Sequence, residues 1–253
     1  MDGYDLYFSS GGYERRYPAP NRATLAVVAR LIEGGRRRVL DFGCGSGRYA
    51  VPLAMRTQAS VVGYDPCTTA LSLLRQRAER AGVGGRIQTV AGSLADLRQA
   101  SASTGPYDLA VILFGVLGHI RHRAERLRHL RAVRDLLAPD GRLVVSVPNA
   151  VRRFRREQVA PWTGDGQREP GDILYERKVD QCRVHLFYHL YRPGELETEM
   201  RDAGFSPEST TSESILPESL IARHPVAGAL DAALRAVVPT RLAYGLLTVA
   251  APG

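Results

Sequence analysis

Short apolar runs alternate with stretches of helical spacing through the first 150 or so residues of the chain. The runs are rich in Val, Ile and Leu and are apolar throughout, which indicates strands covered on both faces. Alternation of strand and helix predicts a parallel sheet with helices on both faces. The expected strands are a run that ends at Asp41, then Ser60–Asp65, Arg86–Val90, Tyr107–Leu113 and Gly141–Val147; the expected helices are Ala50–Arg56, Thr68–Ala81 and His122–Leu137.

The second half of the chain predicts a different arrangement. Asp172–Val179 and Arg183–Tyr191 alternate in polarity and follow two glycine- and proline-containing turns, which indicates a hairpin. Further strands are expected over Phe205–Glu213 and Leu242–Ala250, and they would close the sheet as an antiparallel edge pair. We therefore expect a single α/β domain over residues 1–253, divided into 1–35 (N-terminal lid and helix), 36–149 (core), 150–192 (insertion) and 193–253 (sheet completion, with helices over Pro193–Ala203 and Pro217–Val238).

A glycine turn follows the first predicted strand. Gly43, Gly45 and Gly47 remove three side chains where a backbone must bend sharply and approach a ligand closely. The dinucleotide fingerprint needs G-x-G-x-x-G, whereas this turn reads G-x-G-x-G with Arg48 in place of the last glycine. The spacing argues against a nicotinamide cofactor.

With Asp41 at the end of the preceding strand, this turn resembles motif I of the class I S-adenosylmethionine-dependent methyltransferases. The resemblance implies a Rossmann-like, mostly parallel seven-stranded sheet, S-adenosyl-L-methionine as cofactor, and methyl transfer. It also implies that Asp65, at the tip of the second strand, accepts both hydroxyls of the cofactor ribose. The residues expected at the cofactor are Asp41, Gly43, Cys44, Gly45, Gly47, Asp65, Pro66, Ser93, Leu94, Phe114 and Tyr17.

Adenine recognition departs from the family pattern. After its third strand the family commonly has an Asp or another polar residue that bonds the adenine amino group, and Ser93 stands at that position here. A serine hydroxyl can make this bond, assisted by the backbone of Leu94. Alternatively, Asp96 reaches the adenine instead.

Residues 113–120 resemble the family's fourth motif, which flanks the methionine end of the cofactor and the incoming nucleophile. His119 is the candidate general base, because an imidazole titrates near neutrality. Alternatively, His119 caps the next helix or orients a backbone carbonyl. Asn149, at the end of the fifth strand, is expected to face the same cleft and to contact substrate.

Aromatic residues crowd the N-terminus, in a segment that is too polar to be core. Tyr13 and Tyr17 are one helical turn apart, which places both on one face with Arg16 beside them, within reach of the cofactor carboxylate. We interpret the segment as a lid and assign Tyr13 to the reacting groups. Alternatively, it is a flap that simply covers the sheet. The other aromatic residues are Tyr4, Tyr7 and Phe8.

The predicted hairpin lies where family members insert substrate-recognition elements. Residues 187–196 are also similar to the tRNA wobble-uridine carboxyl methyltransferases, in which a tyrosine–histidine run precedes a Gly-Glu-Leu helix. We assign Tyr188 and His189 to substrate binding. Because neighbouring strand residues point to opposite faces, only one of the two sets faces the cleft.

The formal net charge is +8, and Lys178 is the only lysine, so the basic excess is almost entirely arginine. Arginines between Arg121 and Arg134 alternate with acids and indicate a solvated helix face, whereas four of the five residues in 152–156 are arginine. That second cluster, with Arg152 assigned to the substrate site, either contacts an anionic substrate or is plain surface. If this cluster contacts a polyanion, the substrate that it favours is tRNA.

Composition limits the remaining alternatives. No apolar run is long enough to span a membrane and the N-terminus lacks a signal-peptide pattern, so we expect a cytoplasmic protein without membrane contact. The three cysteines lack metal-ligand spacing, so we expect no metal site. Residues 227–237 are apolar at helical spacing, which fits either core packing or a homodimer surface.

These features predict a methyltransferase that modifies an oxygen, nitrogen or carboxylate of a small metabolite. A tRNA-modifying enzyme is the first alternative, carried by the arginine cluster and the tyrosine–histidine run. The second is a cofactor-binding protein without catalysis.

Overall fold

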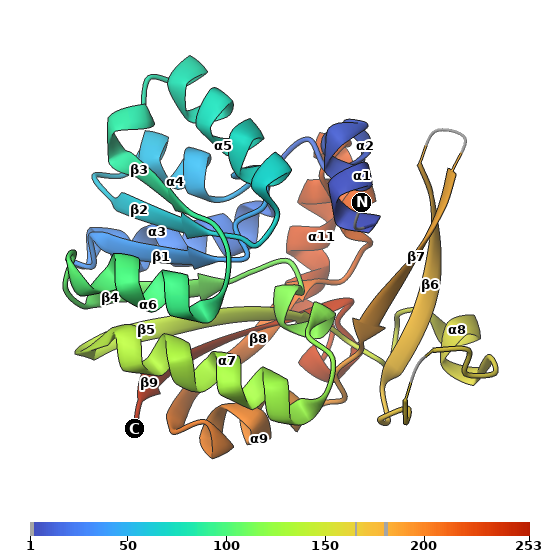
Figure 1. Ribbon diagram of the computed structural model, residues 1–253. Helices are drawn as coiled ribbons and strands as arrows, with labels where there is room; N and C mark the ends of the chain where they lie inside the picture. The colour runs from blue at the N-terminus through green and yellow to red at the C-terminus, as the bar shows by residue number, and fades with distance from the viewer. Residues whose placement is uncertain (1–2, 165, 180–181) are drawn as a thin grey trace.

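A computed structural model describes residues 3–164, 166–179 and 182–253, without the side chains of Tyr4, Val179 and Cys182. Seven strands form one sheet in the order β3-β2-β1-β4-β5-β9-β8, and β6 and β7 form a separate hairpin (Figure 1). The sheet strands are β1 (Arg38–Phe42), β2 (Ser60–Tyr64), β3 (Ile87–Val90), β4 (Tyr107–Ile112), β5 (Leu137–Pro148), β8 (Phe205–Ser214) and β9 (Gly245–Pro252), and the hairpin strands are β6 (Asp172–Val179) and β7 (Cys182–His189).

Strand direction follows the sequence prediction. The first five strands pair in parallel, and β9 runs antiparallel to both β5 and β8. Five parallel strands with crossover helices require covered faces, which explains their continuous apolar runs. The predicted fold, a mostly parallel seven-stranded sheet with an antiparallel pair at one edge, is confirmed.

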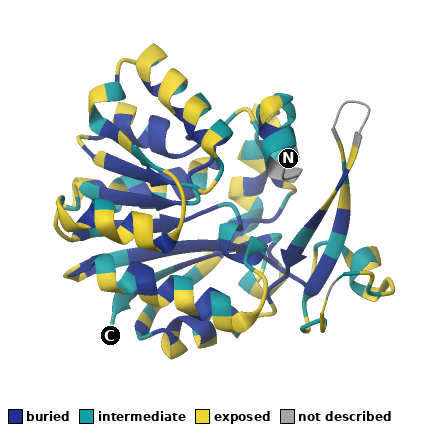
Figure 2. Ribbon diagram, in the orientation of Figure 1, coloured by how far each residue is buried: buried dark blue, intermediate teal, exposed yellow. Residues whose placement is uncertain are grey.

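The core has two layers because strand residues alternate between faces. Val39 packs with helices α3, α4 and α5 on one face, and its neighbour Leu40 packs with α6, α7 and α9 on the other. Figure 2 shows both layers as buried strands under helices that are exposed on their outer sides. The helices are α3 (Arg22–Glu33), α4 (Ala50–Arg56), α5 (Thr68–Arg80), α6 (Leu94–Ala102), α7 (Arg123–Leu136) and α9 (Glu195–Asp202).

Two predicted elements differ from the structure. The expected helix over Pro217–Val238 is divided into α10 (Glu218–Ile221) and α11 (Pro225–Val237). Pro225 occupies the first turn of α11, where its missing N–H costs nothing, but a proline cannot continue a helix that precedes it. The last strand begins at Gly245 instead of Leu242, because residues 240–242 form a 3-10 turn.

The N-terminal segment and the hairpin pack against each other. Helices α1 (Gly3–Ser9) and α2 (Gly12–Arg16) lie between α5 and the hairpin in Figure 1, and β6 is preceded by the short helix α8 (Arg155–Val159). Tyr7 is buried in a cluster with Tyr175, Leu186 and Tyr188 of the hairpin. The expectation that the N-terminal segment is too polar for the core is therefore wrong for Tyr7 and for Phe8, which is also buried.

The charged face predicted for the helix near 122–137 is only partly solvated. Arg126 on α7 is 1% exposed and donates to Glu199 of α9 at 2.8 Å and to Glu169 at 3.3 Å. A buried guanidinium is tolerated because two carboxylates neutralise it. The arginine-rich pattern therefore contains residues that join α7 to α9, since Arg123 and Arg131 contact Asp202 of α9 as well.

Helix α11 turns apolar side chains outward. Val226 and Leu230 are 83% and 53% exposed, and Val237 lies on the same stripe of the helix. The exposed stripe is the surface on which the dimer prediction rests. Among the described residues, no helix is long and apolar enough to cross a membrane, and the expected cytoplasmic location stays a prediction.

Candidate functional site

A cavity of about 620 Å³ opens where the parallel strands end. Ligands of open α/β sheets bind at this carboxyl edge. The N-terminal helices, the glycine turn, the segment after β4 and the inner face of the hairpin all line it. Of the predicted site residues, the cavity contains Asp41, Gly43, Cys44, Gly45, Asp65, Pro66, Phe114, Tyr13, Tyr17, His119 and Tyr188.

The glycine turn has the conformation that its sequence predicts. Gly43 and Gly45 have φ angles of 76° and 51°, which non-glycine residues rarely adopt. A Cβ atom on Gly43 would lie 2.4 Å from Val116 Cγ1, so the turn also approaches the segment after β4 very closely. Gly47 is buried beneath the turn, where a Cβ atom would lie 2.2 Å from Leu74, and it does not line the cavity.

Two carboxylates face the cavity from neighbouring strands. Asp41 is buried, its Oδ2 has no hydrogen-bond partner among the described residues, and burial raises its pKa to about 7, with the charge of Asp65 adding to the effect. Asp65 accepts hydrogen bonds from the Gly45 and Cys67 amides, each at 2.9 Å. Burial raises the pKa of Asp65 despite these bonds. Both carboxylates are thus held in a site that a cationic or hydroxyl-bearing ligand would stabilise.

Arg48 stands where the dinucleotide fingerprint has its last glycine. In the structure it is buried and forms part of the cavity wall. One Nη bonds Glu218 at 3.1 Å, and the other, Nη1, is buried without a partner among the described residues. Its guanidinium carbon lies 4.0 Å from the centre of the Phe114 ring. An unpaired buried N–H group on a charged side chain suits an anionic ligand group.

The aromatic wall contains the two tyrosines that the spacing placed together. Tyr13 and Tyr17 have ring centres 5.7 Å apart, and both contact Phe114. Phe114 has a φ of 62°, a strained conformation that typically occurs at functional sites. Arg16, expected to reach the cofactor carboxylate, instead donates to the Tyr17 hydroxyl at 3.1 Å and does not line the cavity.

His119 lies on the 3-10 turn η2 (Val116–His119) and lines the cavity. Its ring stacks on Tyr188 at 4.3 Å, and its Nδ1 lies 3.1 Å from the carbonyl oxygen of Phe187. A carbonyl can only accept, so Nδ1 carries the proton and Nε2 is the basic nitrogen. Burial lowers the pKa of His119 to about 4, so the ring is neutral at physiological pH.

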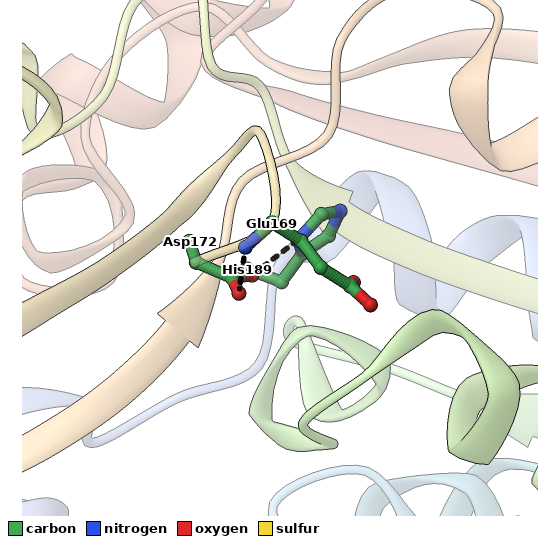
Figure 3. A group of neighbouring side chains, drawn as sticks. All are labelled: Glu169, Asp172 and His189. Carbon is green, nitrogen blue, oxygen red and sulfur yellow. Dashed lines mark hydrogen bonds and ion pairs between the residues drawn. The ribbon is translucent and has the colours of Figure 1, made fainter. Parts of the chain in front are cut away.

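The hairpin separates Tyr188 from His189, as their alternation predicts. Tyr188 faces the cavity, whereas His189 is buried on the other side and does not line the cavity, a placement that does not favour its predicted role in substrate binding. Its Nδ1 bonds Asp172 at 2.8 Å and its Nε2 bonds Glu195 at 3.1 Å (Figure 3 shows Asp172 and the neighbouring Glu169). Burial alone would lower the pKa of His189, but these two hydrogen bonds outweigh it and raise the pKa.

This histidine cluster fixes the base of the hairpin. The Asp172 carboxylate also accepts from the Glu169 amide at 3.0 Å, which closes the turn before β6. Glu169, Asp172 and His189 are close enough to hold a metal ion, but each is already engaged in hydrogen bonds within the cluster or with Arg126. Both ring nitrogens of His189 face carboxylates, which can only accept, so both donate and neither has a lone pair for a metal. We interpret the cluster as a group of ion pairs that holds the base of the hairpin.

Two further substrate assignments fall outside the cavity. Asn149 is fully buried, and its amide nitrogen donates to the Arg241 and Ala243 carbonyls. Arg152 is exposed and donates to the Leu242 carbonyl. Both side chains therefore hold the segment before β9 in place, and substrate contact by either stays a prediction that this placement does not favour. The next residue, Arg153, lines the cavity instead.

The expected adenine contacts are also displaced from the cavity. Ser93 caps α6, and Asp96 bonds both its hydroxyl and its amide at 2.7 Å. This reciprocal capping uses the Ser93 hydroxyl and the Asp96 carboxylate together. Leu94 is packed in the core, and none of the three residues lines the cavity. Adenine recognition by Ser93 stays a prediction that these contacts do not favour.

Comparison with known proteins agrees with this geometry. Residues 13–210 match the family described as "Methyltransferase domain". A ubiquinone biosynthesis O-methyltransferase of Azorhizobium caulinodans is 29% identical over 174 residues, which are 66% of this chain and 58% of that protein. The chain thus spans less than two thirds of the length of that curated relative.

Solved structures share the fold at low sequence identity. The CcbJ methyltransferase of Streptomyces caelestis has a TM-score of 0.63 at 19% identity, covering 93% of this chain and 91% of its own. An S-adenosylmethionine-dependent methyltransferase of Clostridium acetobutylicum has a TM-score of 0.63 at 11% identity, covering 90% and 89%. With the fold, the cavity and a family match over most of its length in agreement, the chain belongs to the methyltransferase domain family.

Proposed function

We propose that this protein transfers a methyl group from S-adenosyl-L-methionine to a small molecule. The observation that carries the proposal is the single cavity in which the glycine turn and two carboxylates adjoin an aromatic wall that contains a histidine. The turn and carboxylates suit a cationic nucleoside cofactor. The aromatic wall suits the alignment of a second substrate beside it.

The residues present fit this cofactor. Asp65 would accept the ribose hydroxyls, and the unpartnered Oδ2 of Asp41 would accept from the ammonium group. The unpartnered Nη1 of Arg48 would bind the carboxylate. Gly43 and Gly45 line the cavity without side chains, so a nucleoside can approach their backbone.

The cofactor, when bound, supplies an activated methyl group on a positively charged sulfur. The protein mainly has to align the acceptor and exclude water. The rings of Tyr13, Tyr17 and Phe114 provide faces that favour a cation. His119 would take the acceptor's proton at Nε2, because Nδ1 is already bonded to the Phe187 carbonyl.

An oxygen of a small metabolite is the acceptor that the comparisons favour. The relative in Azorhizobium caulinodans is named for O-methylation in ubiquinone biosynthesis. A tRNA substrate has less support, because the predicted arginine cluster divides: Arg152, Arg155 and Arg156 are exposed, whereas Arg153 lines the cavity. A homodimer through the exposed stripe of α11 stays a prediction, which light scattering would test.

Calorimetric titration tests the proposal most directly. The protein should bind S-adenosylmethionine and its product S-adenosylhomocysteine, but not nicotinamide dinucleotides. A methyl-release screen against pooled small metabolites and bulk tRNA would then identify the acceptor class. Failure to bind either sulfur compound would overturn the proposal, whereas binding without turnover on any acceptor would favour a cofactor-binding protein without catalysis.

Replacing Asp65 with alanine should weaken S-adenosylmethionine binding by about tenfold or more, because two hydrogen bonds to a charged group are lost. Calorimetry on the purified variant would measure the change. Asp140→Ala serves as the control, because Asp140 is exposed and lies near the start of β5, at the end of the strand away from the cavity. Unchanged affinity in the Asp65 variant would remove this residue from the cofactor site.

Replacing His119 with alanine should lower kcat by about 100-fold while cofactor affinity changes less than about twofold. The pH profile gives a second test. Because the pKa of His119 is lowered to about 4, the base form predominates above about pH 5, and kcat/KM should fall through this group only at lower pH. Normal turnover in the variant would make His119 a structural residue, and His224→Ala, at an exposed histidine outside the cavity, is the control.

A further inference from the structure

Three arginines line the hairpin side of the cavity. Arg121 lies between η2 and α7, Arg153 follows β5, and Arg177 belongs to β6. None of them forms an ion pair with a carboxylate among the described residues. Each lies instead against an aromatic ring: Arg121 over Phe187 at 4.9 Å, Arg153 over Tyr244 at 4.8 Å, and Arg177 over Tyr175 at 4.9 Å.

Buried arginines elsewhere in the molecule are neutralised. Arg126 pairs with two glutamates, and Arg48 pairs with Glu218. The acidic residues of the cavity come from the opposite side, at α1, β1 and β2: they are Asp5, Asp41 and Asp65. The cavity is therefore acidic toward the proposed cofactor site and basic toward the hairpin.

Arg153 contacts the most aromatic rings of the three. Its guanidinium lies between Tyr244, Tyr188 and Phe154, with ring centres 4.8, 5.5 and 5.4 Å away. Its Nε atom is fully buried, and among the described residues no acceptor receives a hydrogen bond from any N–H of this side chain. Cation–π contacts offset only part of the cost of burying a charge. A site that keeps such a residue unpaired is suited to an anion that arrives with a ligand.

The shape of the surrounding wall identifies the rest of that ligand. Tyr175 and Tyr188 share one face of the hairpin and line the cavity, with ring centres 5.9 Å apart, and Tyr188 stacks on His119. Flat aromatic surfaces favour a planar ring between or against them. An acceptor bound there has its ring beside His119 and its charge beside Arg153.

We propose that the methyl acceptor is an aromatic acid whose carboxylate is bound by Arg153, with Arg121 and Arg177 adding to the positive field. The proposal rests on the methyltransferase function argued above. A carboxylate suits this position because the planar, forked guanidinium matches its two oxygens, whereas a neutral acceptor would leave the charge unpaired. The methyl group goes to a ring hydroxyl: the oxygen–carbon bond forms as the sulfur–carbon bond breaks, and the hydroxyl proton passes to His119.

Two probes that differ only in the carboxylate test this inference. Protocatechuate and catechol would be titrated into the protein saturated with S-adenosylhomocysteine, and methyl transfer to each would be measured with S-adenosylmethionine. The wild-type protein should bind protocatechuate at least about tenfold more tightly than catechol, as expected for a charge-assisted bidentate contact. Equal affinities would overturn the inference without any variant.

Arg153→Gln and Arg153→Lys test whether Arg153 causes the preference for protocatechuate over catechol. The glutamine variant should lose about tenfold or more in protocatechuate affinity with little change for catechol, and the lysine variant should regain only part of it because the fork is absent. Arg152→Gln is the matched control, since it removes the same charge one residue away, outside the cavity. An equal loss for both probes in the Arg153 variants would indicate a packing role and contradict carboxylate recognition.

Cofactor binding in the same samples separates the two proposals. If S-adenosylhomocysteine binds and the probes are not discriminated, the aromatic-acid inference fails while the methyltransferase proposal stands. If S-adenosylhomocysteine does not bind to the wild-type protein, the methyltransferase proposal itself fails, and with it the basis for this inference.

Discussion

Replacing Asp41 with asparagine is expected to weaken S-adenosylmethionine binding by about 100-fold and, at the same time, to stabilise the protein without cofactor. Asp41 is buried near the end of β1, and its Oδ2 has no hydrogen-bond partner among the described residues, so a cationic ligand group gains a charge-assisted bond there. Removing one partner of a buried charge pair costs a few kcal/mol of binding energy, about 2–5 in measured complexes. Calorimetry gives the affinity.

The stability gain follows from the pKa of the same residue. Burial raises the pKa of Asp41 to about 7, whereas an unfolded aspartate ionises near a pH of about 4. The unfolded chain therefore releases this proton first, and the folded state is destabilised progressively as the pH rises from about 4 to about 7. At pH 8 the full cost is present and asparagine removes it, so thermal unfolding of the variant should occur at a higher temperature.

Cofactor affinity should depend on pH through this carboxyl as well. Below about pH 7 the free protein holds Asp41 protonated, and only the ionised fraction can pair with a cation. The affinity for S-adenosylmethionine should thus fall by up to about tenfold for each pH unit below 7. The variant should lose this dependence, and Asp140→Asn should retain it. A pH-independent wild-type affinity would contradict the assignment of Asp41 to the ammonium group.

The sheet and the cofactor half of the site could be predicted because their signals are local. Gly43 and Gly45 need positive φ angles within a few residues of an apolar strand, and Asp41 and Asp65 simply end their own strands. Parallel strands bring their carboxyl ends to one edge whatever lies between them. The order of the strands along the chain was therefore enough to predict that the glycine turn and the two carboxylates lie together.

The other half of the site depends on which way a side chain turns after a strand ends. Arg152 and Arg153 are indistinguishable in the sequence, yet the first contacts the Leu242 carbonyl on the surface and the second enters the cavity. Alternation along a strand places Tyr188 and His189 on opposite faces of the hairpin, but it does not say which of them faces the cavity. That is decided by Asp172 and Glu195, which bond His189 on the face away from the cavity.

Polar pairs, one distant along the chain and one local, explain the positions of Arg48 and Ser93. Arg48 is buried because Glu218, which lies 170 residues further along the chain, neutralises it. Ser93 is turned away from the cavity because Asp96 completes a capping box with it. The residues S-x-x-D before an apolar run are a capping signal that the sequence already contains, so the position of Ser93 could have been predicted. The Arg48 pairing carries no such local signal.

Replacing Gly43 with alanine is expected to abolish measurable cofactor binding and to destabilise the fold by about 2–5 kcal/mol. The positive φ of 76° strains any L-residue, which costs about 1–2 kcal/mol. The new Cβ atom would lie 2.4 and 2.7 Å from the two methyl groups of Val116, and overpacking of this kind costs about 1–3 kcal/mol more. Val116 cannot turn away easily because its branched side chain is restricted.

Moving Val116 away from the added Cβ atom should also disturb the proposed reacting groups. Val116 begins η2, whose last residue is His119, so a shift of Val116 displaces the proposed base as well as the glycine turn. Gly82→Ala isolates the backbone effect, because Gly82 has a φ of 69° but no atom within 4 Å of the added Cβ. Chemical denaturation and calorimetry should show a modest loss of stability and normal cofactor affinity for the Gly82 variant. Equal losses in both variants would mean that the close approach of the turn to Val116 does not shape the site.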